Sequence, residues 1–417
     1  MLLGNIRKDF MKKIAVITMG IRLNNEKGYT RFRFLCEFLV QNGFEVDLIT
    51  TSFQHWEKAH RDINSIKKDE YSFGVHFIDE PGYKKNLDAR RIYSHHVASK
   101  NLKKLLEKGG NYDLIYCEIP PNDVALEAAK YAKKKGIPFV PDVNDLWPEA
   151  MRMVIDIPIL SDILFYPFLR DAEKVYRLSS AIVGTSDEYS ERPFIYSKKK
   201  IPRETVYVGN EINVFDAGVK KYSESIKKGK EFWVTYAGTI GTSYDIQTLI
   251  LAADYLKTQG YDNIYFKILG GGPLKEKLEK QARELKGQVE FVGYVPYEEM
   301  AAYLNKSEIL VNSFVKKAPQ SIVTKIGDYL AAGRPMINTC SSLEFRRKVE
   351  DEGFGINIEA ENPNILAEAI VSIYNNKKWQ EEMGRKARKV AEEQFDRPIS
   401  YKRIVDLINR LLGENEK

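Results

Sequence analysis

The chain has 417 residues, of which 43% are hydrophobic and 29% charged, with a formal net charge of +6 at pH 7. The composition is ordinary for a globular protein, and at about 100–200 residues per domain the length predicts two domains. The three cysteines lie far apart without metal-ligand spacing, so we interpret them as small buried side chains in a reducing compartment. The mild charge, with no recognition motif or compact basic stripe, argues against a nucleic-acid partner.

Short apolar runs alternate with helical patterns along the first half. Residues 13–18 predict a buried strand, a loop runs from Gly20 to Gly28, and a helical pattern ends at Gly43. The further strands are expected at 45–50, 113–117, 138–143 and 180–185, with a helix at 124–135.

A second series of the same kind begins after Val206. Strands are expected at 232–236, 265–269, 289–292, 309–312 and 335–339, and helices at 245–257, 274–285, 298–305 and 325–332. Each series opens with a strand, a glycine-bearing loop and a helix, which is typical of parallel sheets that bind ligands at the carboxyl ends of their strands.

The predicted fold class is therefore α/β, with two Rossmann-like domains whose parallel sheets face a central cleft. We expect a flexible extension at 1–10, a first Rossmann-like domain at 11–205 and a second at 206–395. Residues 396–417, which end in a helix at 399–412, are expected to dock back on the first domain. The segment 196–211, with its proline and glycine, is the predicted linker.

No secretory signal opens the chain, and its most apolar stretch, 154–169, is interrupted by Asp156, Pro158, Asp162 and Pro167. We therefore expect a cytoplasmic protein. Basic pairs and triplets in the first half could form a face for an anionic membrane, at the inner side of the plasma membrane; ordinary solvated helix faces are the alternative. They are Lys84-Lys85, Arg90-Arg91, Lys103-Lys104, Lys133 to Lys135 and Lys198 to Lys200.

Two glycine-rich loops follow predicted strands of the second series. Gly238 and Gly241 flank Thr239 at a helix start, where free backbone N–H groups suit a phosphate. Gly271 lies in the similar run 270–273. Tight turns explain such glycines equally well. The spacing lacks the third glycine of a dinucleotide fingerprint, which disfavours a nicotinamide cofactor.

The segment 319–335 carries the most specific pattern. Gln320 and Asp328 are eight positions apart, so a loop residue and a helix residue could meet one elongated ligand. Asp328 could accept two ribose hydroxyls, and Gln320 could pair with sugar hydroxyls. The N–H groups of Ser321, Ile322 and Val323 would face phosphates at the helix start.

These pieces together resemble family-four retaining glycosyltransferases of the GT-B fold, especially enzymes of bacterial polysaccharide and lipopolysaccharide assembly. The resemblance covers nearly the whole chain, and its motifs are specific only in combination. They are the opening strand with Gly28, Asp142 to Glu149, Tyr236 to Gly241, Gly270 to Pro273, Phe291 to Val295 and Asp328 to Pro335.

The resemblance implies that the domain at 11–205 is the acceptor side and that the domain at 206–395 binds the nucleotide sugar. It also implies roles for several residues. The family has two glutamates separated by seven residues, one touching the donor hexose and one the ribose; Gln320 and Asp328 stand at those positions. The main chain near Tyr294 and Val295 is implied to meet the base.

Relatives also place an arginine and a lysine on the donor pyrophosphate, where Thr239 and Tyr244 stand here. We therefore expect another cation, and Lys325 is the candidate because it lies three residues before Asp328 on the same helical face. Lys316 and Lys317 are weaker candidates, since they read as solvated loop charges.

In the first half, many relatives have a histidine where Asn144 stands, and the subgroup resembled here follows it with an aspartate and Leu-Trp-Pro-Glu. Asp145 and Glu149 are thus candidates to face the acceptor or the donor sugar. The alternative is a capped loop in which Asp145 holds backbone amides and Glu149 occupies a first helical turn.

The expected activity is retaining transfer of a sugar from a nucleotide donor, UDP- or GDP-linked, to a lipid-linked or saccharide acceptor. The candidate catalytic residues are Asp145, Glu149, Gln320 and Lys325. The five histidines show no paired spacing, so neither a metal nor a cofactor is expected. The alternatives are a nucleotide-sugar epimerase of the same fold and a sugar-binding protein that has lost catalysis.

Overall fold

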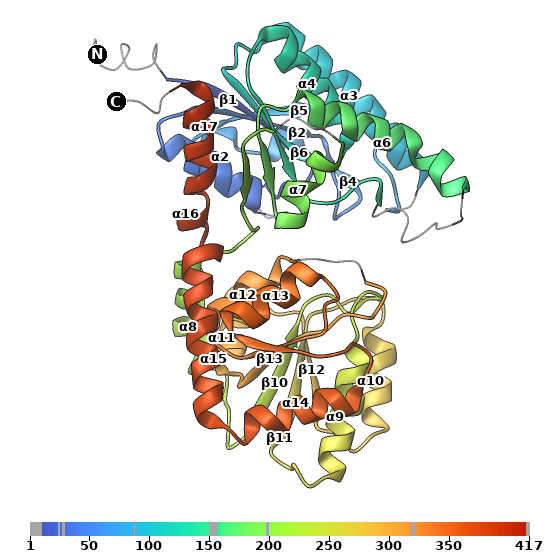
Figure 1. The fold of residues 1–417 in the computed structure, drawn as a ribbon, viewed down its shortest axis with the longest axis vertical. Helices are drawn as coiled ribbons and strands as arrows, with labels where there is room; N and C mark the ends of the chain where they lie inside the picture. The colour runs from blue at the N-terminus through green and yellow to red at the C-terminus, as the bar shows by residue number, and fades with distance from the viewer. Residues whose placement is uncertain are drawn as a thin grey trace. The chain divides into compact units, whose positions relative to one another are not determined.

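The computed structural model describes residues 11–23, 26, 30–86, 88–149, 157, 159–196, 200–318 and 322–413. They form two compact units (Figure 1). The first takes the chain up to Val206 together with the segment from Tyr401 onward, and the second runs from Tyr207 to Ser400. The extension expected at 1–10 lies outside the described residues.

The first unit is built on one sheet whose strand order is β5-β2-β1-β6-β7-β8-β9, with every pairing parallel. Its strands are β1 (Lys13–Ile17), β2 (Glu45–Thr51), β5 (Gly74–Ile78), β6 (Leu114–Ile119), β7 (Phe139–Val143), β8 (Ile182–Gly184) and β9 (Arg203–Thr205), with a small hairpin of β3 (Phe53–Gln54) and β4 (Ala59–His60). Its helices are α2 (Arg31–Gln41), α3 (Ala89–Gly109), α4 (Asn122–Lys135), α6 (Leu160–Leu178), α7 (Asp187–Tyr196) and α17 (Lys402–Leu412), with 3-10 turns at Ile63–Ser65 and Lys68–Glu70.

The second unit repeats the design with the strand order β12-β11-β10-β13-β14-β15, again all parallel. Its strands are β10 (Phe232–Ala237), β11 (Ile264–Leu269), β12 (Val289–Gly293), β13 (Ile309–Asn312), β14 (Met336–Asn338) and β15 (Gly355–Asn357). Its helices are α8 (Ile212–Tyr222), α9 (Ile246–Thr258), α10 (Lys275–Arg283), α11 (Tyr297–Lys306), α12 (Lys325–Ala331), α13 (Leu343–Glu352), α14 (Pro363–Tyr374), α15 (Lys377–Val390) and α16 (Arg397–Ser400), with a π-helical turn at Ala391–Phe395.

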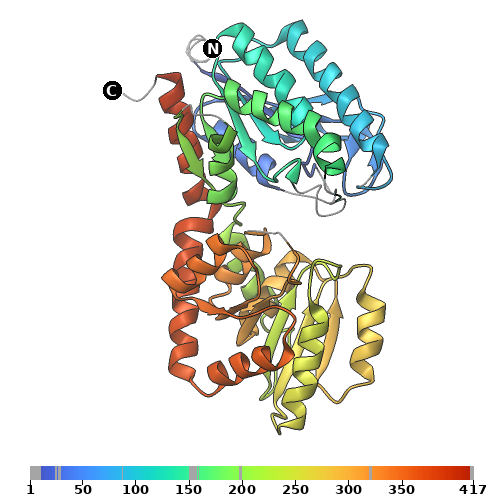
Figure 2. The same cartoon turned by 45° about the vertical axis from the view of Figure 1, so that its right-hand side comes forward.

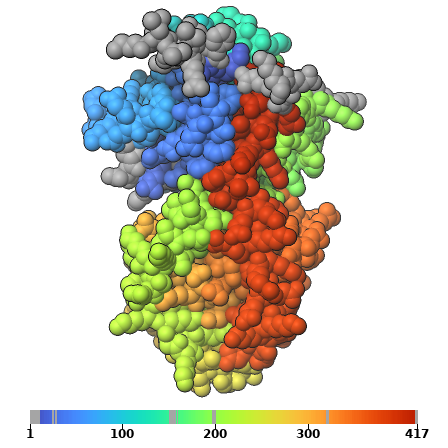
Figure 3. All heavy atoms as spheres, turned by 90° about the vertical axis from the view of Figure 1, so that its left-hand side faces the viewer, coloured from blue at the N-terminus to red at the C-terminus, as the bar shows by residue number. Residues whose placement is uncertain are grey.

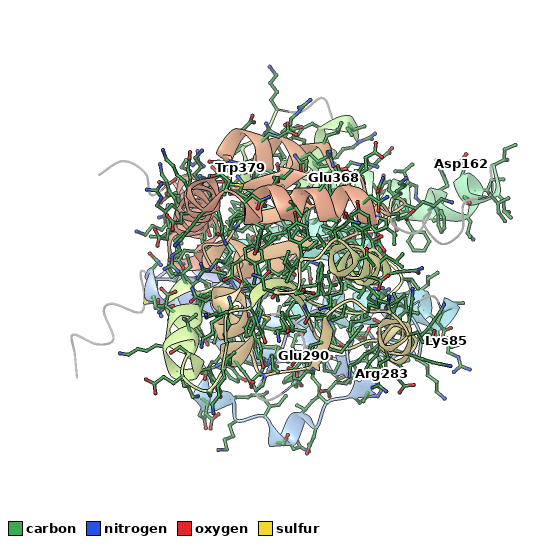
Figure 4. All side chains as sticks on the ribbon, turned by 90° about the horizontal axis from the view of Figure 1, so that it is seen from below. Lys85, Asp162, Arg283, Glu290, Glu368 and Trp379 are labelled. Carbon is green, nitrogen blue, oxygen red and sulfur yellow. The ribbon has the colours of Figure 1, made fainter. Side chains whose placement is uncertain are left out.

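Helices cover both faces of each sheet (Figure 2). Along β1, Ile14 and Val16 enter one core, packed by α2 and α17, while Ala15 and Ile17 enter the other, packed by α3, α4 and α6. Because a strand buried on both faces has no polar side to show, its sequence is a continuous apolar run, as predicted. In the second unit, Figure 4 shows Glu368 of α14 and Trp379 of α15 at one side and Glu290 of β12 at the other.

A buried polar network ties the end of the chain to the first unit. Arg31 of α2 forms an ion pair with Asp142 of β7 at 3.0 Å and donates to the Tyr401 hydroxyl at 2.9 Å. The Arg31 guanidinium also donates to the carbonyl of Val206, and the Tyr116 hydroxyl donates to Asp142. Figure 3 shows α17 (red) beside α2 (blue), where the Tyr401 and Phe34 rings meet at 5.3 Å.

Three expectations about the connections need correction. The predicted linker 196–211 contains β9, which pairs with β8 as the edge of the first sheet, so the residues up to Val206 are part of that unit and those from Tyr207 part of the second. The helix predicted at 399–412 is two helices, α16 and α17, separated at Tyr401. The first unit accordingly regains the chain at Tyr401, after the boundary expected at 395.

The three cysteines are unpaired and buried, as predicted. Within the described part of the chain, no helix combines the length and the apolar character needed to cross a bilayer. Of the apolar stretch 154–169, the structure describes residues 157 and 159–169, in which α6 begins at Leu160.

Candidate active site

In the sheet of the second unit, β11 and β12 lie on one side of β10, and the chain then crosses to the other side to add β13. Ligands of such sheets bind at the carboxyl ends of the strands next to this switch point. The chain leaves β10 at Gly238 and leaves the neighbouring strand β11 at Gly270. Both predicted glycine loops therefore start at the same edge of one sheet.

The two glycine loops pack backbone against backbone. The amide of Ile240 donates to the carbonyl of Gly271 at 2.9 Å, and that of Gly238 donates to the carbonyl of Leu269 at 3.0 Å. A Cβ at Gly270 would lie 2.0 Å from the Gly238 carbonyl oxygen, so no side chain fits there. Gly271 differs, because no atom of the described part of the chain lies within 4 Å of its Cβ position. The tight-turn explanation therefore holds for Gly270, and Gly271 presents open backbone.

The helix after the first loop does not leave its N-terminus free. Asp245 caps α9 by accepting from the amide of Thr248 at 3.1 Å. The exposed part of the loop, at Thr239, lies before this cap and is fixed by the Tyr236 hydroxyl, which donates to the Thr239 carbonyl at 2.7 Å. Loop amides, and not the capped end of α9, are thus what this edge offers to an anion.

The Lys325 amine lies against this loop in a cage of aromatic rings. Its nitrogen is 4.3 Å from the ring centre of Tyr236, 4.6 Å from that of Tyr244 and 5.2 Å from that of Phe314. The side-chain carbon Cδ lies 3.7 Å from the Cβ position of Gly238. Although part of the Lys325 residue is exposed, the amine is buried and has no hydrogen-bond partner among the described residues.

Burial lowers the pKa of Lys325 to about 7, because a charged amine has no carboxylate here to replace the water that it has lost. The cation–π attraction to the surrounding rings offsets only part of this lowering of the pKa. Tyr244 stands where the resemblance implies a cation, and its ring packs against the amine of Lys325, which comes from α12. A positive group thus reaches the glycine loop from a different element.

Asp328 lies in the first turn of α12, three residues after Lys325, as predicted. Its Oδ1 accepts from the Tyr297 hydroxyl at 2.7 Å and from the Asn210 amide at 2.9 Å. Burial raises its pKa, and these two hydrogen bonds oppose the rise. Among the described residues no donor reaches Oδ2, so that oxygen is left for a ligand. Sequence reasoning named neither Tyr297 nor Asn210.

The remaining predicted donor residues are placed as follows. Tyr294 is 87% exposed and directly follows β12, with Val295 half-buried beside it. Ile322 and Val323 lie just before α12, which begins at Lys325 as predicted, and the contact of their amides with phosphates stays a prediction. Gln320, Ser321 and Gly28 lie outside the described residues. Lys316 and Lys317 are exposed, as solvated loop charges are.

In the first unit, the carboxyl ends of β1 and β6 meet at the corresponding switch point. Glu118 of β6 accepts from the Thr18 hydroxyl at 2.5 Å and from the amides of Met19 and Gly20. Burial raises the pKa of Glu118 to about 7, against the effect of these hydrogen bonds. Glu118, which the sequence did not single out, thereby fixes the backbone that leaves β1.

The motif after β7 adopts a tightly bonded loop. Asp145 accepts from the amide of Leu146 at 2.9 Å and from the Trp147 side chain, and burial raises its pKa. The Asn144 amide donates to Asp142, and Glu149 forms an ion pair with Arg192 of α7. The contacts of Asp145 agree with the capped-loop alternative. A contact of Asp145 or Glu149 with a substrate stays a prediction.

Across the described residues, no three His, Cys, Asp or Glu side chains gather as a metal ion would require. Lys325 and Asp328 of α12 are the candidate ligand-binding charges at the edge of the second sheet.

Comparison with known proteins identifies this arrangement. Residues 219–390, which carry both glycine loops and α12, match the family model described as Glycosyl transferases group 1. The protein is a glycosyltransferase of the GT-B fold.

Solved structures share the fold of this glycosyltransferase over nearly its whole length. HepE from Anabaena, in complex with UDP, is 15% identical with a TM-score of 0.69, covering 96% of this chain and 100% of its own. Sucrose-phosphate synthase from Thermosynechococcus elongatus is 17% identical with a TM-score of 0.71, covering 96% and 99%. WaaG, a glycosyltransferase involved in lipopolysaccharide biosynthesis, is 12% identical with a TM-score of 0.62, covering 95% and 99%. A search of curated proteins found no match to the sequence.

Proposed function

We propose that this glycosyltransferase moves a sugar from a nucleoside diphosphate donor to a lipid-linked or saccharide acceptor, with retention of anomeric configuration, in cell-surface polysaccharide assembly. The HepE structures with UDP and UDP-glucose, and the WaaG structure, support a uridine nucleotide donor and this kind of pathway. The resemblance to family-four enzymes supports retention.

The observation that carries the proposal is the placement of Lys325 at the glycine loop. A departing diphosphate gathers negative charge, and a preorganised cation together with loop amides stabilises that charge. The exposed backbone at Thr239 and the open backbone at Gly271 lie at the same sheet edge, while the Gly238 and Ile240 amides hold the two loops together. Asp328, with its free Oδ2, is suited to two ribose hydroxyls at the other end of the same ligand.

In this mechanism the protein positions the two substrates and stabilises the charge of the leaving phosphates, and it does not need to supply a base. The leaving phosphate can take the proton of the acceptor hydroxyl on the same face of the sugar, so no second carboxylate is needed. Asp145 and Glu149 are proposed to face the acceptor or the donor sugar, and Gln320 the sugar hydroxyls. Since Lys325 provides the positive charge at the phosphates, we propose that transfer requires neither a metal ion nor a cofactor.

The test is donor turnover with a panel of UDP- and GDP-sugars, with and without an extract of lipid-linked and saccharide acceptors, and with EDTA present or absent. We expect one donor to be consumed only when acceptor is present, unchanged rates in EDTA, and an anomeric proton of the product with the configuration of the donor. Conversion of the donor without acceptor would indicate an epimerase, and tight binding without turnover a sugar-binding protein.

We further propose that the first unit attaches to an anionic membrane through the start of α6. Figures 1 and 4 show this end, with Asp162, projecting from the unit. Apolar side chains around Asp162 are more than 45% exposed, and basic residues follow on the same helix. The apolar ones are Ile157, Ile159, Leu160, Ile163, Leu164 and Tyr166, and the basic ones Arg170, Lys174 and Arg177.

Replacing Ile163 and Leu164 together by Gln should weaken co-sedimentation with anionic vesicles about tenfold, because each loses apolar area that the membrane interface would cover. Ile195→Gln, at an apolar residue of α7 that is 70% exposed, is the control and should have little effect. Wild-type binding should disappear in high salt. Equal binding of the double variant, or no wild-type binding at low salt, would contradict the proposal.

A further inference from the structure

A group of cations and aromatic rings lies in the first unit, whereas the glycine loops belong to the second. Lys58 is in the turn between β3 and β4, Tyr83 follows β5, and Arg91 is in the first turns of α3. We call Lys58, Tyr83 and Arg91 the cation cluster. It adjoins the loop after β7, since the Arg91 guanidinium stacks on the Trp147 ring at 4.6 Å.

The two cations of the cluster share one aromatic ring. The Lys58 amine lies 5.0 Å from the centre of the Tyr83 ring, and the Arg91 guanidinium 5.4 Å from it. Neither cation has a carboxylate within 4 Å among the described residues, and the Nε of Arg91 is buried without a partner. Lys58 donates to the main-chain carbonyl of His55 and lies 3.3 Å from the His55 ring nitrogen. Arg91 donates to the main-chain carbonyl of Asn86 and also bonds to the Tyr83 side chain.

The acidic groups nearest the cluster are already engaged. Glu80 accepts from the Ser94 hydroxyl at 3.1 Å and also from Thr51. Asp145 is held by the Leu146 amide and the Trp147 side chain. Both carboxylates are buried, which raises their pKa values. Both carboxylates attract the Arg91 charge, but among the described residues neither forms an ion pair with Arg91 or Lys58.

Backbone strain and charge repulsion both oppose the close placement of the two cations. Lys58 has a positive φ of 54°, a conformation that is unfavourable for a side chain of this kind. Burial, and then the charge of Arg91, lower the pKa of Lys58 to about 8. His55, whose ring nitrogen is 2.5 Å from the Tyr83 hydroxyl, has its pKa lowered to about 4 and is neutral. An anion between Lys58 and Arg91 would remove their repulsion and occupy the unpaired donor.

We propose that the cation cluster binds the phosphate group of the acceptor. A guanidinium fork and an ammonium together match the geometry and the charge, near −2, of a phosphate better than those of a single carboxylate. The inference rests on the proposed transferase function, and it identifies the acceptor as a phosphorylated molecule. The phosphate belongs either to a lipid diphosphate or to a sugar phosphate, which share this chemistry.

The experiment measures binding to the full chain by calorimetry, with farnesyl diphosphate in detergent and glucose 1-phosphate as separate probes and UDP in parallel. The variants are Lys58→Met and Arg91→Met, which keep the apolar stems. Arg90→Met is the matched control, because Arg90 is the exposed neighbour on the same helix. Thermal unfolding of each variant is recorded as well.

We expect the wild type to bind at least one probe, and Lys58→Met and Arg91→Met each to weaken that binding about tenfold or more, with Arg90→Met within about twofold. The tighter probe identifies the source of the phosphate. UDP affinity should stay the same in all variants. If Arg91→Met lowers the unfolding temperature, Lys58→Met on its surface turn and the charge-preserving Arg91→Lys still decide the question.

Unchanged probe affinity in both Met variants, equal loss in Arg90→Met, or no probe binding by the wild type would overturn the cluster as a phosphate site. Absence of UDP binding by the wild type would instead count against the proposed donor function. The two failures are therefore distinguishable in one set of titrations.

Discussion

Lys325→Met is expected to lower the rate of sugar transfer by about 100-fold or more, as removal of one preorganised charge stabiliser does. The Lys325 amine is the described cation that lies against the Gly238 loop, and its burial excludes the water that would otherwise screen it. Methionine fills a similar volume among the same rings but cannot carry charge, so the loss should appear in kcat more than in protein folding.

The same variant should be more stable than the wild type near neutral pH. The pKa of Lys325 falls from its ordinary 10.5 to about 7 in the folded protein, because burial disfavours the charged amine. The unfolded chain thus holds more protons between these values, so wild-type stability rises with pH across that window. Lys325→Met removes the penalty, which should raise the free energy of unfolding by about 1–3 kcal/mol at pH 7 and by little above pH 10.5.

Donor binding should show the opposite dependence. If the diphosphate favours the charged amine, binding must restore its proton above pH 7, and wild-type UDP affinity should fall by up to about tenfold per pH unit from pH 7.5 to 9.5. The groups facing the amine are the phenols of Tyr236, Tyr244 and Tyr329, and the thiol of Cys340. Burial raises the pKa values of Tyr236 and Tyr329, so neither phenol ionises in this range.

Lys316→Met is the control for all three measurements, because Lys316 is exposed and should change turnover and stability little. Near-normal turnover in Lys325→Met would defeat the role in transfer even if its stability increased. A flat pH profile of UDP affinity in the wild type would show that the amine does not meet the phosphates.

Asp328→Ala is expected to weaken nucleotide binding by about 1.5–3 kcal/mol, the range for hydrogen bonds to a charged group. The free Oδ2 of Asp328 is the acceptor that we assign to the ribose, while Tyr297 and Asn210 hold Oδ1 in place. Tyr297→Phe removes one of these two supports and should have a smaller effect in the same direction.

Titration with UDP and 2′-deoxy-UDP separates a ribose contact from a general loss of structure. The wild type should distinguish the two nucleotides, and Asp328→Ala should distinguish them much less, since the hydroxyl that differs would have lost its partner. A discrimination ratio that is unchanged in Asp328→Ala would refute the ribose assignment, whatever the affinity for UDP.

The parallel sheets were predictable because their central strands are buried on both faces. β1, β6 and β10 are short, largely apolar runs followed within three residues by glycine or proline, a pattern typical of buried strands. The edge strands β9 and β15 are three residues long and largely polar, so they left no apolar signal. The long helix α3 was missed because the face that it buries contains Ser94, His95 and Ser99 as well as apolar residues.

The candidate site was predictable only where it is local in sequence. Lys325 and Asp328 lie one helical turn apart, so the face that they share followed from their spacing. The rings around Lys325 come from β10, the loop after it, the end of β13 and α12, and no spacing relates these positions. The same holds for the cation cluster, whose members come from two loops and a helix.

The return of the chain to the first unit also has a consequence for synthesis on the ribosome. One core of that unit contains Ile404, Leu407 and Ile408 of α17 next to β1 and α2, and Arg31 reaches its full set of partners only with Tyr401. Domains generally fold in the order in which they are translated. Here the second unit can complete its core while the first, although translated earlier, must wait with an open apolar face for the last residues of the chain.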